Sequence, residues 1–230
     1  MDDAAVEMRP VARIRSDFPT KFGIPRQSGL VRELRARIIF EPEFRDPEAL
    51  RGLEGFSHIW LLWVFSGSVG HRWSPTVRPP RLGGNTRMGV FATRSPFRPN
   101  PLGLSSVRIE KIDLHTDEGP VIFVSGADLM DGTPILDIKP YVPYADSHPD
   151  ALGGFANTAA GPTLRVTLPE PLPDCFPPDR RAALEAVLAQ DPRPSYQDDP
   201  ESIYGLAFAG CNIRFRVEGD KLTVLCIEPL

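Results

Sequence analysis

The sequence predicts a mainly β protein, in which an antiparallel β-barrel domain is followed by a small α+β module. Three observations predict this class. Short β-like segments recur through the first 150 residues, and turn-rich loops such as SPTVRPPRLGGN and LMDGTP separate them. Helical periodicity is scarce in the same stretch. No regular strand–helix alternation and no G-x-G-x-x-G after a strand is found, which argues against a Rossmann-type nucleotide site.

Seven strands are predicted in the barrel domain, which we place at residues 1–155. They are expected at Val11–Arg15, Ala36–Phe40, Ile59–Phe65, Met88–Thr93, Ser105–Leu114, Val121–Ser125 and Ile135–Ile138. The run IWLLWVF at 59–65 is the longest apolar run, far too short to cross a bilayer and typical of a buried strand. A helical turn over His58–Leu62, capped by Ser57, is the alternative interpretation.

A second, smaller module is predicted at residues 163–230. The weakly patterned stretch ANTAAGP at 156–162 is typical of a linker. After the Pro-rich PEPLPDCFPPD, Asp179 is expected to cap a helix over Arg180–Gln190. The apolar face of this helix is formed by Leu184, Val187 and Leu188. Asn212–Val217 and Leu222–Ile227 alternate around EGD, which predicts a hairpin.

Composition is that of an ordinary globular protein, with 41% apolar and 24% charged residues in 230. The N-terminus, MDDAAVEMRP, has acidic residues and no apolar signal core. Three cysteines without paired spacing favour reduced thiols, and four scattered histidines give little support for a metal. We therefore expect a cytoplasmic protein with no metal and no membrane partner.

The charge distribution is uneven. The net charge is −4, yet residues 55–109 contain seven arginines and no Asp or Glu. That segment carries +7, so the remainder carries −11, since −4 − 7 = −11. A patch of one sign attracts polyanions, and the guanidinium fork matches phosphate and carboxylate. The alternative is that these arginines pair with acids elsewhere in the chain.

Within this segment lies the stiff loop ATRSPFRPNPLGLSSVR, residues 92–108. Pro96, Pro99 and Pro101 restrict their own backbone and that of the residue before each. Two interpretations compete: a Pro-rich strand connection with solvated arginines, or a preorganised pocket wall for an anionic or polar ligand.

Six motifs occur in a fixed order along the chain: PRQ at 25–27, GLEGFSHIW at 52–60, RPPRLGG at 78–84, FATRSPFRPNPLGLS at 91–105, DGTPILDIKPY at 131–141 and DPRPSY at 191–196. Together they closely resemble the TsaA/TrmO-like family of tRNA methyltransferases, from about residue 10 to the C-terminus. The resemblance implies a β-barrel methyltransferase domain, neither Rossmann nor knotted, that works as a homodimer. It also implies S-adenosylmethionine as methyl donor and N6-threonylcarbamoyladenosine (t6A), next to the anticodon of tRNA, as acceptor.

When the family's cofactor-binding positions are transferred to the matching motifs of this chain, the resemblance implies a set of cofactor-binding residues. They are Pro25, Arg26, Gln27, Ser66, Gly67, Arg94, Leu104, Asp131, Gly132, Thr133 and Pro134. Many relatives have His where this chain has Ser66. The chemistry agrees with the set, because Arg26 or Arg94 can bind a carboxylate and Asp131 can accept from an ammonium or ribose hydroxyl. The DGTP stretch alone would be interpreted as a plain β-turn.

Two further roles are predicted. Asp137 is a candidate base for the acceptor nitrogen, with Lys139 and Tyr141 as orienting groups; the alternative is a structural Asp137–Lys139 pair. The residues expected to bind tRNA are Arg72, Arg78, Arg81 and Arg98. Two other functions remain open: a non-catalytic RNA-binding or regulatory protein on the same barrel, and a methyltransferase for another nucleic acid or a small molecule.

Overall fold

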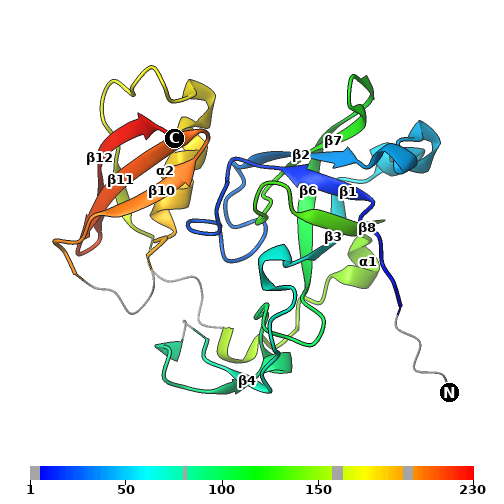
Figure 1. The fold of residues 1–230 in the computed structure, drawn as a ribbon, viewed down its shortest axis with the longest axis horizontal. Helices are drawn as coiled ribbons and strands as arrows, with labels where there is room; N and C mark the ends of the chain where they lie inside the picture. Colours follow the sequence, from blue (N-terminus) through cyan, green and yellow to red (C-terminus); the bar gives the residue numbers. More distant parts are fainter. Residues whose placement is uncertain (1–5, 80–81, 157–162, 194–198) are drawn as a thin grey trace.

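A closed six-stranded barrel forms the first part of the molecule (Figure 1). This computed structural model describes residues 6–79, 82–156, 163–193 and 199–230. Around the barrel the strands run β1 (Ala12–Arg15), β2 (Arg35–Phe40), β7 (Gly119–Ser125), β6 (Leu102–Thr116), β3 (His58–Val64) and β8 (Pro134–Pro140). Every neighbouring pair, including the closing pair β1–β8, is antiparallel. The predicted fold class is confirmed.

The barrel core is built by strict alternation along the strands. In β3, Ile59, Leu61 and Trp63 point inward and are buried. They meet Ile14, Ile38, Ile122, Val124 and Ile135 from the other strands. Because alternate residues of IWLLWVF face opposite sides, the segment is a strand, and the alternative of a helical turn over His58–Leu62 is wrong. The outward residues Trp60, Leu62 and Val64 are half-buried.

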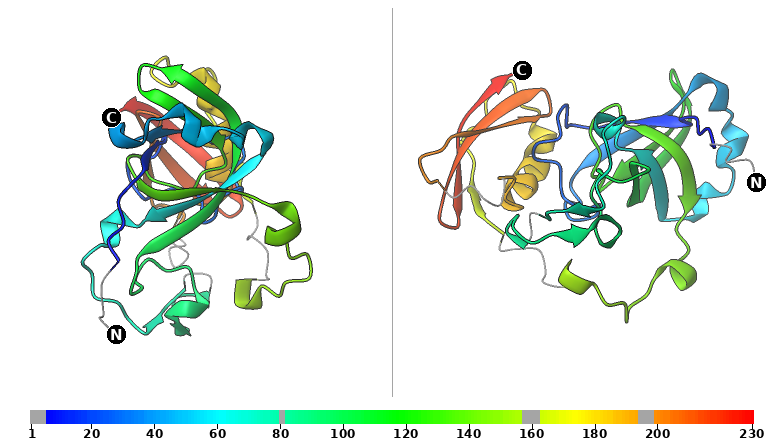
Figure 2. Two further views of the ribbon diagram at one scale, coloured as in Figure 1. Left: turned by 90° about the vertical axis from the view of Figure 1, so that its right-hand side faces the viewer. Right: turned by 60° about the horizontal axis from the view of Figure 1, so that its bottom comes forward.

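Between β3 and β6 the chain leaves the barrel as a long arm (Figure 2). The arm contains the short pair β4 (Thr76–Val77) and β5 (Met88–Gly89). The predicted strand Met88–Thr93 is therefore wrong beyond Gly89, where a 3-10 turn, Val90–Ala92, follows. Thr93 Oγ1 donates to the Val90 carbonyl at 2.8 Å, and this local bond replaces pairing with a neighbouring strand.

Short helical turns join the remaining elements of the barrel. A four-residue helix, α1, spans Pro143–Asp146. The 3-10 turns include Pro42–Phe44, Pro47–Leu50, Leu53–Gly55, Ser66–Ser68 and Gly154–Ala156, and a further turn, Pro178–Arg180, lies in the C-terminal module. No helix in the described ranges is long and apolar enough to cross a membrane.

The C-terminal module packs one helix on a four-stranded sheet. The sheet order is β10 (Tyr204–Phe208), β11 (Cys211–Glu218), β12 (Lys221–Pro229) and β9 (Arg165–Thr167), with β9 parallel to β12. The β11–β12 pair is the predicted hairpin. Helix α2 spans Arg181–Ala189, and its predicted apolar face is buried. The predicted cap is wrong, because Asp179 lies inside the Pro178–Arg180 turn and bonds to Arg180. Most of the predicted linker, residues 157–162, lies outside the described residues.

The segment between β1 and β2 joins the barrel to this module (Figure 1). Phe18, Val31 and Leu34 belong to the core of the C-terminal module. The Phe18 and Phe208 rings lie 5.1 Å apart, and the Ala209 N–H donates to the Asp17 carbonyl at 2.9 Å. The C-terminal module therefore fixes the segment that carries PRQ.

Candidate functional site

The stiff loop is anchored where it enters β6. Gly103 lies opposite Trp63 in the β3–β6 register, and a Cβ on Gly103 would lie 2.2 Å from the indole ring. The ring can pack there only because position 103 has no side chain. Phe65 N–H donates to the Pro101 carbonyl at 2.9 Å, and Arg98 Nη1 donates to the Thr93 carbonyl at 3.1 Å. The loop is thus rigid at its end and cross-linked within itself.

Two predicted cofactor residues that are 67 positions apart meet beside this loop. Arg94 Nη1 donates to Gln27 Oε1, and Gln27 Nε2 donates to the Arg26 carbonyl. Arg94 is exposed, and a guanidinium has five donor hydrogens, of which the contact with Gln27 uses one. The structure therefore brings the PRQ motif and the stiff loop together.

The other two residues of PRQ face the C-terminal module. Pro25 is buried, and Arg26 is exposed. They line a cavity of about 50 Å³ together with Gln190, Asp191 and Pro192. Asp191 and Pro192, the first residues of the DPRPSY motif, therefore lie beside PRQ, and residues 194–196 of the motif lie outside the described residues. Sequence reasoning missed this contact, because a motif match carries no information on which motifs touch.

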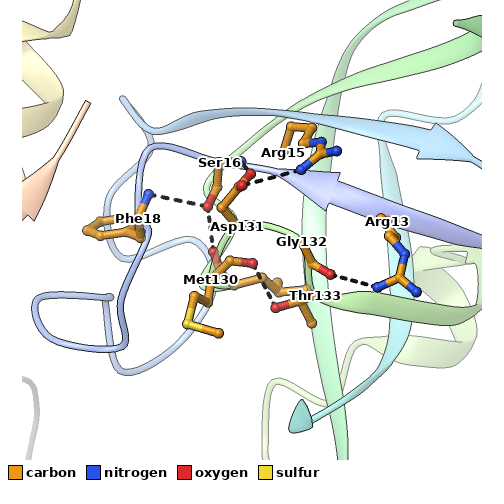
Figure 3. A network of polar contacts seen from close by, with 9 residues as sticks. Arg13, Arg15, Ser16, Phe18, Met130, Asp131, Gly132 and Thr133 are labelled. Carbon is orange, nitrogen blue, oxygen red and sulfur yellow. Dashed lines mark hydrogen bonds and ion pairs between the residues drawn. The ribbon is translucent and has the colours of Figure 1, made fainter. Parts of the chain in front are cut away.

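The Asp131–Pro134 turn is held against β1 (Figure 3). Asp131 Oδ1 accepts from the Ser16 N–H at 3.0 Å, and Oδ2 lies 3.4 Å from Arg15 Nη1. Gly132 has φ +75°, a conformation that favours glycine, and its carbonyl accepts from Arg13 at 3.2 Å. Thr133 Oγ1 donates to the Met130 carbonyl at 2.7 Å. These bonds hold the turn in one shape and leave the Asp131 carboxylate partly exposed.

Sequence reasoning missed a chain of hydrogen bonds that runs from buried Trp63 and Ser105 to half-buried Asp128. Trp63 Nε1 donates to Ser105 Oγ at 3.0 Å, and Ser105 Oγ donates to Asp128 Oδ1 at 2.6 Å. Burial raises the pKa of Asp128, while the hydrogen bond from Ser105 and the charge of Arg94 act in the opposite direction. An acid directly after the apolar run VIFVSGA was the available sequence signal.

Leu104 and Asp137 lie on the outer wall of the barrel. In the register, Leu62 is the partner of Leu104 on one side and of Asp137 on the other. Leu104 is 55% exposed. Asp137 Oδ2 lies 3.0 Å from Lys139 Nζ, so the structural pair that the sequence left open is formed. The residues Ser66 and Gly67 are exposed in the turn directly after β3.

Among the arginines of the acid-free segment that the structure describes, only Arg108 has an ion pair with an acid. Arg72 and Arg78 are exposed, and Arg98 is bonded to its own loop. Arg81 lies outside the described residues. Large exposed aromatic side chains lie in the same arm: Trp73, Phe91 and Phe97, at 51%, 74% and 48% exposure. Among the residues that the structure describes, no cluster of three or more His, Cys, Asp or Glu could hold a metal ion.

Comparison with known families identifies the class of protein. Residues 13–147 match the tRNA-methyltransferase O N-terminal domain, and residues 170–230 match the TrmO C-terminal domain. The barrel with its C-terminal module is therefore that of a tRNA methyltransferase.

Individual relatives define the family. The tRNA (adenine(37)-N6)-methyltransferase of Escherichia coli K12 is 40% identical over 234 residues, which cover 98% of this chain and 99% of the relative. A Pseudomonas aeruginosa protein named a putative S-adenosylmethionine-dependent methyltransferase is 44% identical over 212 residues, 86% of each chain. The crystal structure of TrmO from Pseudomonas aeruginosa matches with a TM-score of 0.78 and 35% identity, over 97% of this chain and 98% of that one. The chain belongs to the TrmO family, and the resemblance carried by the six motifs is confirmed.

Proposed function

We propose that this protein transfers the methyl group of S-adenosylmethionine to N6 of t6A at position 37 of tRNA, giving m6t6A. Membership of the TrmO family and the name of the Escherichia coli relative support adenine 37 as the site. The observation that carries the proposal is the contact between Arg94 and Gln27, which joins two separate motifs at an exposed guanidinium. We further propose that residues 1–155 bind the cofactor, that residues 163–230 support tRNA binding, and that the protein is cytoplasmic.

The residues that we assign to the site have the chemical groups that binding of S-adenosylmethionine requires. S-adenosylmethionine supplies an electrophilic methyl group on its sulfonium centre. Arg94 has free donors for a carboxylate, and Gln27 fixes its direction. Gly132 lets the backbone approach closely, and Leu104 offers exposed apolar surface to a purine. We assign cofactor binding to the set Pro25, Arg26, Gln27, Ser66, Gly67, Arg94, Leu104, Asp131, Gly132, Thr133 and Pro134.

Asp137 is proposed as the group that takes the proton from the acceptor nitrogen. Lys139 Nζ lies 3.0 Å from Asp137 Oδ2, and a carboxylate oxygen is a group that can accept a proton from the acceptor nitrogen. The Ile138 N–H donates to Asp137 Oδ1 at 2.9 Å and orients the carboxylate. Replacing Asp137 with Asn should lower kcat and leave cofactor affinity near the wild-type value; an unchanged kcat would remove the assignment.

Arg72, Arg78, Arg81 and Arg98 are proposed to bind tRNA phosphates. Because residues 55–109 contain no acid, no carboxylate of this segment competes with the RNA. Exposed Trp73, Phe91 and Phe97 lie among these arginines and provide flat surfaces on which unpaired anticodon-loop bases can stack.

A homodimer is proposed, with the cofactor site near the subunit boundary. The outer face of β3 is apolar and only half-buried, and Leu102 and Leu104 beside it are 40% and 55% exposed. Such a surface is typical of an interface. In the described contacts, the Gln27–Arg94 pair, the Asp131 turn and Leu104 form three separate groups, and a second copy could bring them together. Sedimentation should show a dimer, and Leu102→Asp should shift it towards monomer.

The reaction itself is tested by incubating the protein with S-adenosylmethionine and tRNA that carries t6A. Mass spectrometry of the digested nucleosides should show t6A converted to m6t6A. If the protein binds the cofactor but no methylated nucleoside forms, the non-catalytic function is favoured. Methylation of another nucleoside would favour a different acceptor. Unmodified tRNA is the control, because it lacks the threonylcarbamoyl group.

A further inference from the structure

The segment between β1 and β2, residues 16–34, reaches two of the motifs that we assign to the cofactor. It contains PRQ at 25–27. Its first residues also hold the Asp131 turn, because the Asp131 N–H donates to the Phe18 carbonyl at 2.8 Å and the Ser16 N–H donates to Asp131 Oδ1 at 3.0 Å. These three residues lie together in Figure 3. A shift of the segment would therefore displace PRQ and the turn together.

The shape of this segment depends on packing. Residues 16–34 contain neither a helix nor a strand, so no ladder of backbone hydrogen bonds holds PRQ. Ordering an irregular stretch of this length costs conformational entropy, which buried side chains must offset. The buried apolar side chains Phe18, Val31 and Leu34 lie in the core of the C-terminal module, whereas the barrel core includes no described residue of the segment. The module therefore supplies the core that orders the segment.

Within the module, the inner face of β10 makes the contacts. Leu206 and Phe208 are the two buried residues of this strand. The Phe208 ring lies 5.1 Å from the ring of Phe18, whose carbonyl bonds to the Asp131 turn. Leu206 packs against Gly23, where a Cβ would lie 2.2 Å from Leu206 Cδ1. Alternate side chains of one strand thus support the segment beside the turn and two residues before PRQ.

Polar contacts from the module act at the same end of the segment. The Ala209 N–H, directly after β10, donates to the Asp17 carbonyl at 2.9 Å. Arg180 Nε lies 2.8 Å from Asp17 Oδ2. Asp17 lies between Ser16 and Phe18, the two residues that bond to the Asp131 turn. The module and the turn therefore grip the same three residues from opposite sides of the chain.

We infer that Leu206 and Phe208 are positioning residues for the methyl-transfer reaction. They hold the segment between β1 and β2, and with it PRQ and the Asp131 turn, in the arrangement that binds S-adenosylmethionine. The inference rests on the proposed function, and it gives the C-terminal module a role in cofactor binding besides the support of tRNA binding.

Phe208→Leu removes the ring that packs on Phe18, and Phe215→Leu is its matched control. Both phenylalanines are fully buried in the core of the module, and the Phe215 ring stacks on Tyr204 with centroids 5.6 Å apart. The same substitution should lower the melting temperature of both variants to a similar extent, because each leaves a cavity in the same core.

Cofactor affinity should distinguish the two variants. Calorimetry with S-adenosylmethionine, at a temperature where both are folded, should show the Kd raised by about ten- to a hundredfold in Phe208→Leu, because small displacements of binding groups are costly. In Phe215→Leu the Kd should stay within about twofold of wild type. Hydrogen exchange in peptides covering residues 16–34 and 126–134 should be faster in Phe208→Leu than in Phe215→Leu.

Steady-state kinetics separate positioning from loss of folded protein. In Phe208→Leu the KM for S-adenosylmethionine should rise while kcat at saturating cofactor stays near wild type, because every side chain assigned to the cofactor and the acceptor is still present. A smaller folded fraction would do the opposite, lowering the apparent kcat at an unchanged KM.

A milder pair of variants carries the test if Phe208→Leu does not fold. Leu206→Val shortens the side chain that packs on Gly23. Leu222→Val is its control, since Leu222 is equally buried in the same core and lies on β12. The Kd should rise in Leu206→Val, by less than in Phe208→Leu, and should stay near wild type in Leu222→Val.

The outcomes separate the inference from the proposed function. If wild type binds and methylates while Phe208→Leu and Leu206→Val bind the cofactor as tightly as their controls, the positioning role is overturned and the proposed function stands. If each variant and its control lose affinity in proportion to stability, the role is structural and the inference is wrong. A wild-type protein that does not bind S-adenosylmethionine overturns both.

Discussion

Arginines inside and outside the acid-free segment differ in the partners that they bind. Outside the segment, most of the described arginines form ion pairs with carboxylates, whereas Arg45 donates to the Phe40 carbonyl. The pairs include Arg13–Glu41, Arg37–Glu118 and Arg165–Asp220, at 2.8–2.9 Å. In these pairs the charges of both groups largely cancel.

Inside the segment, three of the described arginines have neutral partners. Arg94 donates to the Gln27 side chain, Arg87 to Thr76 Oγ1, and Arg98 to the Thr93 carbonyl. Among the described residues, Arg108 is the one arginine of this segment with an ion pair, 3.6 Å from Glu110. A neutral partner fixes the direction of a guanidinium without cancelling its charge. The difference teaches that, among the described arginines, charge is neutralised by an acid less often in this segment than elsewhere.

The largest expected effect comes from the arginine that joins the two motifs. Arg94→Ala should weaken S-adenosylmethionine binding by about 2–5 kcal/mol, because a charge-assisted contact to the cofactor is lost. Calorimetry on the folded variant measures this. Arg87→Ala is the control, since Arg87 lies in the same segment and contacts Thr76. Equal affinities of Arg94→Ala and wild type would remove Arg94 from the site.

A second effect is expected on stability, from an arginine outside the segment. Arg180 Nε lies 2.8 Å from Asp17 Oδ2, and both side chains are mostly buried. Arg180→Ala should lower the free energy of unfolding by about 1–3 kcal/mol, because Asp17 loses its charged partner. Denaturant titration measures the loss, and a change confined to tRNA binding would contradict it.

The pH dependence of this variant sharpens the test. Burial raises the pKa of Asp17, and the Arg180 charge opposes that rise. Without Arg180 the pKa should rise further. Since an acid with a raised folded-state pKa binds its proton more tightly in the folded protein, its contribution to stability is present at low pH and lost as pH rises. The stability deficit of Arg180→Ala should therefore be larger near neutral pH than in mildly acidic buffer.

A third effect concerns the exposed arginines of the arm. Arg72→Ala and Arg78→Ala should each reduce the slope of log K against log salt for tRNA by roughly one unit. Cofactor affinity should stay near wild type. Binding titrations at several salt concentrations measure the slope. Slopes equal to that of wild type would mean that the acid-free segment is not a binding face.

The smallest effect is expected for an ion-paired arginine. Arg37 and Glu118 lie 2.9 Å apart with roughly half of each side chain exposed. Arg37→Ala should change stability by less than about 1 kcal/mol, because exposed ion pairs are weak, and should leave the tRNA salt slope unchanged. If Arg37→Ala reduced the slope as much as Arg72→Ala, the distinction between the two regions would fail.

Local patterns predicted most of the strands and the C-terminal hairpin. Alternation along IWLLWVF has the same period as the pleat, so burial in β3 follows from the sequence. Prediction from the sequence failed where local hydrogen bonds compete with strand pairing or with helix capping. Residues Val90–Ala92 have a strand-like composition, yet they form a 3-10 turn closed by Thr93, and the Pro178–Arg180 turn displaces Asp179 from the helix cap.

For the site, the sequence by itself determined which motifs are present, how stiff the loop is, and that one segment lacks acids, because these are properties of neighbouring residues. Only the tertiary structure decided that Arg94 meets Gln27, that PRQ lies beside Asp191 and Pro192, and that Trp63 and Ser105 form a chain of hydrogen bonds to Asp128. These contacts depend on how the strands close into a barrel and how the C-terminal module packs against the segment after β1. The physical reason is that a hydrogen bond depends on distance in space, and sequence separation does not specify that distance until the core has packed.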